Sequence, residues 1–268
     1  MKTCIVLLLP NALRHKWLAR CLTSLASYYL NAFPTDVVIF HESGFSVSNQ
    51  LSIKQQLPNI TVVFKEIQFT IPNIVKNDTN FKPRWCDGYW GADRCISYGG
   101  MCTFFAMDIF RHLNEMGYSY YARLDDDSEI KTPIGYDMFN NMKSNNLVYC
   151  YNMSMWEAPH VICGAFDFIH SNLNENSIIN KQYRFDDSNR MLYYYNNFEV
   201  VNVDLYLNRT KEINALIHES GNIYYYRWGD APIRTILLNL LFDKNSIRKM
   251  QFSYSHNDIH TSGCREQQ

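Results

Sequence analysis

The chain has 268 residues, of which 47% are hydrophobic and 19% charged, so it can bury a sizeable core and is not a disordered polar polymer. Its net charge of -1 provides no general attraction for nucleic acid or for an anionic membrane surface, and we expect no nucleic-acid partner. No run approaches the roughly 18 apolar residues of a transmembrane segment. With no signal sequence either, we expect a cytoplasmic protein, cellular or viral, or a fragment that has lost its anchor.

The first section of the chain, up to Phe64, alternates between strand and helix patterns. Strands are predicted at Lys2–Leu9, Asp36–His41 and Asn59–Phe64, with a helix at Arg14–Leu30 between the first two. Strand, helix and strand at this spacing indicate a parallel sheet with crossover helices. Such sheets bind ligands at the carboxyl ends of their strands, so functional residues are expected there.

The rest of the chain continues this pattern less regularly. In chain order we expect a long loop over 69–91, a helix over Ile96–Asn114, strands over Tyr118–Leu124, Leu147–Tyr151 and Val161–Phe168, a polar excursion over Asn172–Asn197, helices over Leu205–Glu219 and Asp230–Leu241, and a strand followed by an irregular segment over Lys249–Cys264. No repeat or interdomain linker interrupts these elements. The sequence therefore predicts one α/β domain with a mixed, mostly parallel central sheet flanked by helices.

The eight cysteines are scattered through the chain. None forms a C-x-x-C pair, which argues against a zinc knuckle. Cys4 and Cys163 lie in apolar runs typical of small core residues. A disulfide through Cys86, Cys95 or Cys264 stays open, because spacing alone cannot pair them.

Three aspartates directly follow an apolar strand pattern, in the run Tyr121-Ala122-Arg123-Leu124-Asp125-Asp126-Asp127. Adjacent negative charges repel one another, and a divalent cation such as Mg²⁺ or Mn²⁺ removes that repulsion through oxygen ligands. Asp125 and Asp127 lie on one side of an extended chain. This is the geometry of a D-x-D site that holds a metal against a nucleotide diphosphate. A solvated acidic turn is the alternative interpretation.

Two other carboxylates stand in apolar or aromatic surroundings. Glu199 ends the run Asn197-Phe198-Glu199, where a partly buried carboxylate is suited to act as a nucleophile or to stabilise an oxocarbenium-like sugar. A surface carboxylate is the alternative there. Asp230 begins a helix pattern two residues after Trp228. It serves either as an N-cap or as an acid aimed into a sugar pocket beside Trp228.

The last run with candidate ligands is Tyr254-Ser255-His256-Asn257-Asp258-Ile259-His260. On a single strand, positions 256, 258 and 260 would face one way and form an H-x-D-x-H pattern suited to a transition metal. Structural histidines are the alternative. Because imidazole binds a metal only when it is neutral, metal affinity is expected to fall in acid.

Together these stretches resemble the fungal Golgi α-1,2-mannosyltransferases, glycosyltransferase family 15. The resemblance covers most of the chain and is clearest over residues 80–264. The matching runs are Arg84-Trp85-Cys86, Ser97-Tyr98-Gly99-Gly100-Met101-Cys102, the run from Tyr121 to Asp127, Asn197-Phe198-Glu199, Arg227-Trp228-Gly229-Asp230-Ala231-Pro232 and Tyr254-Ser255-His256.

The resemblance implies a GT-A-type fold, GDP-mannose as the nucleotide-sugar donor, Mn²⁺ as cofactor, and retaining transfer to the 2-hydroxyl of a mannoside or to another glycan or glycoprotein acceptor. It also implies a Golgi location, in place of the cytoplasmic one expected above. The chain would form a single catalytic domain over 1–268. Residues 1–130, ending in the aspartate cluster, would bind the nucleotide sugar, and residues 131–268 the acceptor.

Residue roles carry over position by position. Asp125 and Asp127 stand where the family has the acids of a metal-binding Glu-Pro-Asp motif, and His256 stands at its second metal ligand. Glu199 matches the proposed nucleophile. The resemblance thus implies Asp125, Asp127 and His256 as metal ligands, Glu199, Asp230 and Tyr98 as catalytic residues, and Asp125, Asp127, Arg123 and Tyr98 as residues that bind cofactor and donor.

The sequence departs from the family at the cluster itself, where Asp125 replaces Glu and Asp126 replaces Pro. The reach to the metal is then one methylene shorter. The first alternative function is therefore a carbohydrate-binding module of the same fold that has lost catalysis. The second is a metal-dependent phosphoesterase that uses the aspartate cluster and the H-x-D-x-H run, which leaves Glu199 and residues 227–232 unexplained.

Overall fold

The computed structural model describes residues 1–13, 15–83, 92–180, 185–256 and 259–261. Its centre is a seven-stranded sheet in the order β3-β2-β1-β4-β7-β6-β8. The strands are β1 Thr3–Leu9, β2 Asp36–His41, β3 Val62–Glu66, β4 Tyr120–Leu124, β6 Tyr149–Glu157, β7 Met191–Asn202 and β8 Ile247–Lys249. All neighbours are parallel except where β7 pairs with β4 and β6. The predicted mixed, mostly parallel sheet is confirmed.

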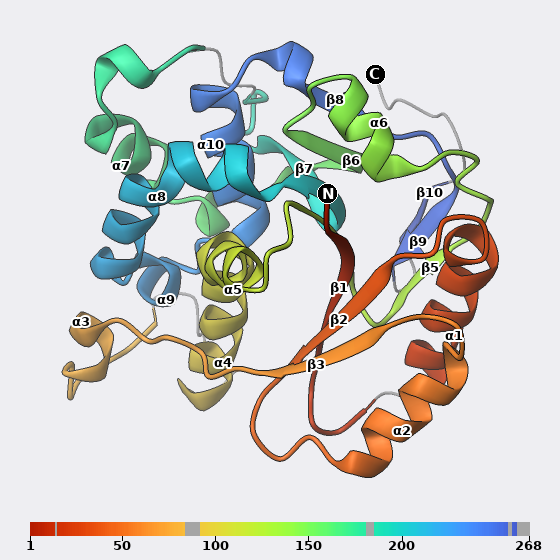
Figure 1. Ribbon diagram of the computed structural model, residues 1–268. Helices are drawn as coiled ribbons and strands as arrows, with labels where there is room; N and C mark the ends of the chain where they lie inside the picture. The colour runs from red at the N-terminus through yellow and green to blue at the C-terminus, as the bar shows by residue number, and fades with distance from the viewer. Residues whose placement is uncertain (14, 84–91, 181–184, 257–258, 262–268) are drawn as a thin grey trace.

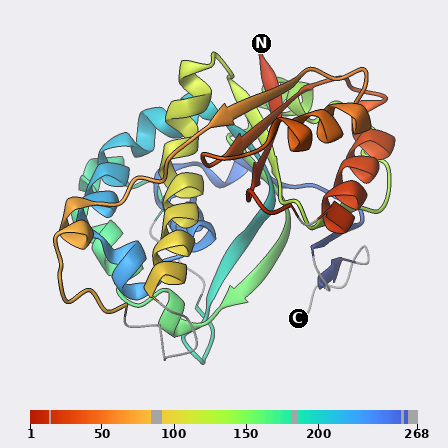
Figure 2. The same cartoon turned by 90° about the horizontal axis from the view of Figure 1, so that it is seen from below.

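Helices cover both faces of this sheet, as Figures 1 and 2 show. One face carries α1 (His15–Leu25), α2 (Val47–Gln56) and α6 (Met138–Ser144), and the other carries α4 (Ala92–Thr103), α5 (Ile109–Glu115), α8 (Val203–Ser220) and α10 (Asp230–Leu241). Strand alternation produces the two cores, since Cys4 and Val6 of β1 pack into one and Ile5 and Leu7 into the other. A strand buried on both faces reads as a continuous apolar run, which is why β1 could be predicted.

Shorter elements complete the chain. They are α3 (Asn73–Lys76), α7 (Ala165–Asn172), α9 (Asn222–Tyr226), π-helical turns at Ala26–Leu30 and Phe104–Asp108, and 3₁₀ turns at Pro159–Val161, Glu175–Ser177 and Lys244–Ser246. A small antiparallel sheet in the order β10-β9-β5 is built from β5 (Ser128–Ile130), β9 (Tyr254–His256) and β10 (Ile259–Thr261). It lies beside the main sheet and reaches the end of β4 through the aspartate turn.

Several predicted elements were wrong. The apolar run over 161–168 forms a 3₁₀ turn and the start of helix α7 rather than a strand, because short apolar runs do not separate the two. The excursion predicted over 172–197 contains more than half of the long strand β7, whose Tyr195, Asn196 and Asn197 side chains are held by tertiary contacts. Cys163 is exposed and not a core residue, whereas Cys4 is buried as predicted.

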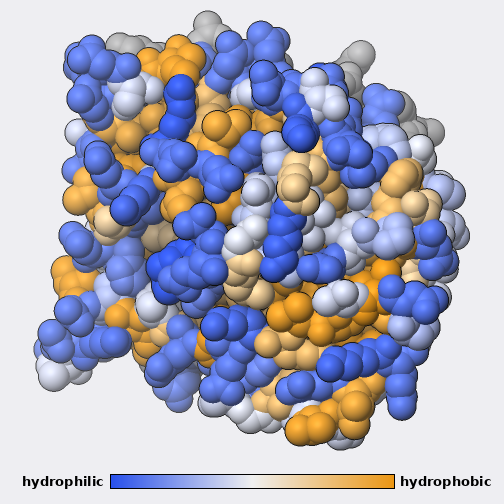
Figure 3. All heavy atoms as spheres, viewed as in Figure 1, coloured by the Kyte–Doolittle hydropathy of each residue, from blue (hydrophilic) through white to orange (hydrophobic). Residues whose placement is uncertain are grey.

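Polar residues dominate the face shown in Figure 3, and hydrophobic residues gather towards its lower right. Helix α2 lies on that side in Figure 1, and it carries the exposed side chains of Val47 and Leu51. Among the described residues, no helix combines the length and the apolar character that crossing a bilayer requires.

The paired glycines of the Ser97–Cys102 run are explained by packing. A Cβ atom on Gly99 would lie 2.6 Å from Cδ1 of Tyr224, and one on Gly100 would lie 2.8 Å from Cβ of Phe69. Contacts this short force neighbouring groups to move. Helix α4 therefore approaches α9 and the segment at Phe69 only because both positions lack a side chain.

Gly99→Ala is therefore expected to destabilise the fold by about 1–3 kcal/mol, the usual cost of overpacking. Urea unfolding followed by circular dichroism measures this. Gly135→Ala is the matched control, because nothing lies within 4 Å of the added Cβ and its backbone is not left-handed. Equal stability of the two variants would contradict the packing explanation.

Candidate active site

The aspartate cluster lies at the carboxyl end of β4, which occupies the middle of the sheet between β1 and β7. After Leu124 the chain turns through Asp125–Asp127, closed by a hydrogen bond from the Ser128 N–H to the Asp125 carbonyl at 3.0 Å. It then enters β5, which pairs antiparallel with β9 so that Ser128 lies opposite His256. This pairing brings a histidine from the end of the chain beside Asp127.

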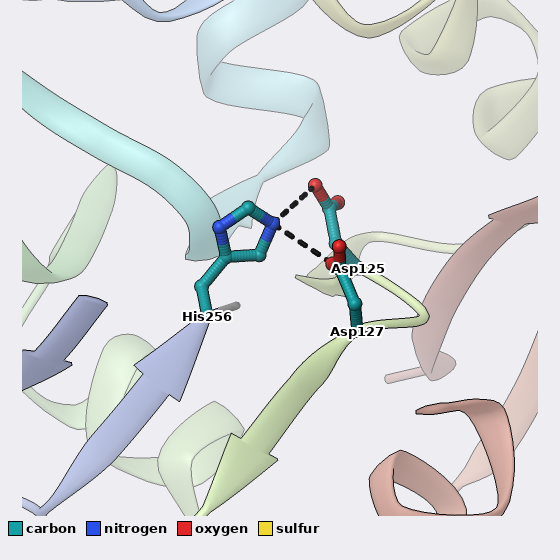
Figure 4. A group of neighbouring side chains, drawn as sticks. All are labelled: Asp125, Asp127 and His256. Atoms are coloured by element: carbon teal, nitrogen blue, oxygen red, sulfur yellow. Dashed lines mark ion pairs between the residues drawn. The ribbon is translucent and has the colours of Figure 1, made fainter. Parts of the chain in front are cut away.

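Asp125, Asp127 and His256 converge, as Figure 4 shows. One ligand atom from each lies within 4.8 Å of the others. The Nε2 atom of His256 is 2.9 Å from Oδ1 of Asp127 and 3.7 Å from Oδ2 of Asp125. Two carboxylates and an imidazole form a donor set that suits Mn²⁺ and other divalent cations. The three residues thus fit a metal ion chemically and geometrically.

The second half of the predicted H-x-D-x-H pattern does not align on one strand. His256 belongs to β9 and His260 to β10, and the two strands form an antiparallel pair in which His260 lies opposite Ser255. Asp258 is outside the described residues. The expectation of a single strand with 256, 258 and 260 on one side was wrong, because the chain reverses after His256.

Arg123 joins the aspartate cluster to Asp230. Its Nε donates to Oδ1 of Asp125 at 2.8 Å, and its Nη1 donates to Oδ2 of Asp230 at 2.6 Å. The guanidinium is only 3% exposed and stacks over the ring of Phe105 at 3.4 Å. Since a buried arginine stays charged, it neutralises part of the negative charge and fixes the two carboxylates relative to each other.

Asp230 does not act as an N-cap. Gly229 occupies the N-cap position of α10, and no side-chain cap bond forms there. The Asp230 carboxylate instead accepts hydrogen bonds from Arg123 and from Nδ2 of Asn196, the latter at 2.8 Å. The N-cap alternative was therefore wrong, because the Asp230 side chain turns to the buried guanidinium of Arg123 and not to the first N–H groups of α10.

The residues around Asp230 differ from the expected sugar pocket. Trp228 is 2% exposed, and its Nε1 donates to the Cys163 carbonyl at 2.7 Å, so its ring cannot stack on a sugar. Tyr98 is a partly exposed aromatic residue nearby, and the guanidinium of Arg227 lies 5.3 Å from its ring centre. Contact with Cys102, burial and the Asp230 carboxylate raise the pKa of Tyr98, so its hydroxyl stays protonated.

Glu199 is fully buried behind this site, so the surface alternative was wrong. It lies opposite Arg123 in the β4–β7 register. Its Oε1 accepts a hydrogen bond from Tyr121 at 2.6 Å, and its Oε2 forms an ion pair with Nε of Arg234 at 3.3 Å. Burial, followed by the Glu199 charge, raises the pKa of Tyr121 well above its usual range. Arg234 itself is 0% exposed, so this is a buried ion pair.

Three residues of β7 contact the site although the sequence analysis gave them no role. Asn197 reaches the Asp125 carboxylate with its Nδ2, which also lies 3.1 Å from Nε2 of His256. Asn196 holds Asp230, and the hydroxyl of Tyr195 lies 2.6 Å from Nδ1 of His256. Asparagine is depleted in strands, so an Asn pair inside one is a signal of function that the sequence offered.

Some sequence signals fall where no structure is described. The run Arg84-Trp85-Cys86 and Cys264 lie outside the described residues. Cys95 takes part in a disulfide, in agreement with the alternatives left open above.

Comparison with known proteins adds sequence relatives. The model of the glycolipid 2-alpha-mannosyltransferase family matches residues 1–268. The probable mannosyltransferase KTR4 of Saccharomyces cerevisiae is 30% identical over 168 residues, which cover 56% of this chain and 36% of that protein. The O-glycoside alpha-1,2-mannosyltransferase omh1 of Schizosaccharomyces pombe is 29% identical over 192 residues, which cover 67% of this chain and 49% of that protein. The matched segments therefore span less than half of these relatives.

Solved structures confirm the fold. Core-mannan synthase A of Aspergillus fumigatus, in its Mn/GDP form, superposes with a TM-score of 0.81 at 17% identity and covers 97% of this chain and 76% of its own. Ktr4p of Saccharomyces cerevisiae, in complex with GDP, superposes with a TM-score of 0.78 at 23% identity. The superposition covers 97% of this chain and 72% of Ktr4p. The predicted GT-A-type fold is confirmed.

Proposed function

The chain belongs to the glycolipid 2-alpha-mannosyltransferase family, and from this premise we propose that it is a retaining α-1,2-mannosyltransferase that moves mannose from GDP-mannose to a mannoside or another glycan acceptor. The observation that carries the proposal is the convergence of Asp125, Asp127 and His256 at the carboxyl end of β4. Support comes from relatives named as mannosyltransferases and from the Aspergillus enzyme solved with Mn and GDP.

Asp125, Asp127 and His256 would hold Mn²⁺, which when bound neutralises the charge that grows on the departing diphosphate. Arg123 fixes the Asp125 carboxylate by donating a hydrogen bond to its Oδ1 atom. The site draws on both parts of the chain, since the aspartates come from residues 1–130 and His256 from 131–268. We assign the first part to the nucleotide sugar and the second to the acceptor.

The other residues are proposed to act on the sugars. Asp230 and Tyr98 orient donor and acceptor through hydrogen bonds. The Asp230 carboxylate is fixed by Arg123 and Asn196, and the Tyr98 hydroxyl stays protonated. Glu199 stabilises the positive charge of the anomeric carbon, covalently or as an ion pair. Its orientation is set by Tyr121 and Arg234.

Thermal unfolding with a panel of nucleotide sugars tests the donor. GDP-mannose with Mn²⁺ is expected to raise the melting temperature, because a ligand at 100 times its Kd stabilises the folded state by about 2.7 kcal/mol. The shift should disappear in EDTA, as should transfer to a mannoside acceptor. Transfer undiminished by EDTA would remove the metal from the proposal.

The same assays separate the two alternatives. A carbohydrate-binding module would bind mannosides without consuming GDP-mannose in the presence of Mn²⁺. A phosphoesterase would hydrolyse p-nitrophenyl phosphate, which the proposed transferase should leave intact.

A further inference from the structure

We propose that the Tyr195 hydroxyl is a positioning group that fixes the ring orientation and tautomer of His256, so that Nε2 presents its lone pair to the cation. The inference deepens the proposed function and rests on it. The Tyr195 hydroxyl contacts Nδ1 of His256, whereas Nε2 faces the acids, so the effect of Tyr195 would be transmitted through the imidazole.

The geometry gives each imidazole nitrogen its own environment. Nδ1 of His256 lies 2.6 Å from the hydroxyl of Tyr195, whose ring stands edge-on to the imidazole at 70°. Nε2 faces the acids instead, at 2.9 Å from Asp127 and 3.7 Å from Asp125. The Nδ2 group of Asn197 is a third neighbour of Nε2, at 3.1 Å. The ring therefore lies between β7 and the aspartate cluster. A flip of the imidazole that exchanged Nδ1 with Nε2 would break the contacts of both nitrogens.

A neutral imidazole carries one proton, and its position decides whether Nε2 can bind a cation. With the proton on Nε2, that nitrogen donates to Asp127 and the Tyr195 O–H donates to Nδ1. With the proton on Nδ1, that nitrogen donates to the Tyr195 oxygen and Nε2 has a free lone pair. A hydroxyl is both donor and acceptor, so it satisfies Nδ1 in either state.

Cation binding would therefore select the second tautomer. One proton passes from Nε2 to solvent and one arrives at Nδ1, so the exchange of neutral tautomers needs no net proton. A phenylalanine at position 195 would leave the Nδ1 proton without this acceptor and would favour the Nε2–H form that blocks the cation. Partners of this kind typically contribute 10–100-fold to metal affinity.

Tyr195→Phe is therefore expected to weaken Mn²⁺ binding about 10–100-fold, measured from the electron paramagnetic resonance of free Mn²⁺ without any substrate. Tyr194→Phe is the matched control on the same strand, because its hydroxyl instead faces Asn239 at 3.4 Å. The control should bind Mn²⁺ as the unchanged protein does. Unchanged Mn²⁺ affinity in a folded Tyr195→Phe variant would overturn the inference.

A tautomer measurement separates positioning from a merely structural role. Long-range proton–nitrogen NMR of the imidazole, with Zn²⁺ as a diamagnetic probe, should show His256 in the Nδ1–H form when Zn²⁺ is bound. An Nε2–H ring in the Zn²⁺-bound protein would overturn the inference. The proposed GDP-mannose transfer would still stand. Failure of the unchanged protein to bind Mn²⁺ would overturn the proposed function, and this inference with it.

Discussion

Asp125→Ala is expected to reduce mannosyl transfer about 10³-fold while the protein stays folded. The lost carboxylate removes one of three cation ligands, and a cation typically supplies several kcal/mol of charge stabilisation in the transition state. The fold survives because Arg123 keeps its contact with Asp230 at 2.6 Å. Initial rates at saturating GDP-mannose and a range of Mn²⁺ concentrations, together with circular dichroism, measure both effects.

Asp126→Asn is the control for this variant. It removes the same charge from the adjacent residue while keeping the side-chain shape, and Asp126 is not one of the three converging ligands. A change in rate of several-fold at most is expected from the lost charge. An Asp125→Ala enzyme that retained more than a tenth of its activity would show that the cation is held by other groups.

Glu199→Gln is expected to have the second large effect, on activity and stability together. Glu199 and Arg234 are both fully buried, so the substitution leaves a guanidinium without its counter-charge. Breaking a buried pair in this way costs about 3–5 kcal/mol. Transfer should also fall by orders of magnitude if the Glu199 carboxylate stabilises the cationic sugar as proposed. Urea unfolding and transfer rates are measured on the same preparation.

The double variant Glu199→Gln with Arg234→Met separates the two contributions. Replacing both members of a buried pair is often neutral for stability, so the double variant should unfold much as the unchanged protein does. It should nevertheless remain inactive if the carboxylate acts on the sugar. Recovery of transfer in the double variant would remove Glu199 from the chemistry and leave it a structural role.

Much of the site could be anticipated from local sequence. The aspartate cluster follows β4 directly, and a strand buried on both faces is recognisable by its apolar run. Helix α10 begins at Asp230 as predicted. Strand β7 was not predicted, because its asparagines are atypical of a central strand and its first half was assigned to a polar excursion. Those polar side chains are stable there because Asp125, Asp230 and His256 satisfy them.

The sequence by itself determined the alternating elements of the parallel sheet and the place of the acidic cluster at a strand end, since burial periodicity and charge clustering are local properties. The family resemblance named His256 as a ligand, but only the tertiary structure decided that its side chain lies beside the aspartates, that Arg123 bridges to Asp230, and that Trp228 is buried. These depend on the pairing of β5 with β9 and of β4 with β7, and on the packing of α10. Pairings between distant segments follow from the packing of the whole chain, which local periodicity does not encode.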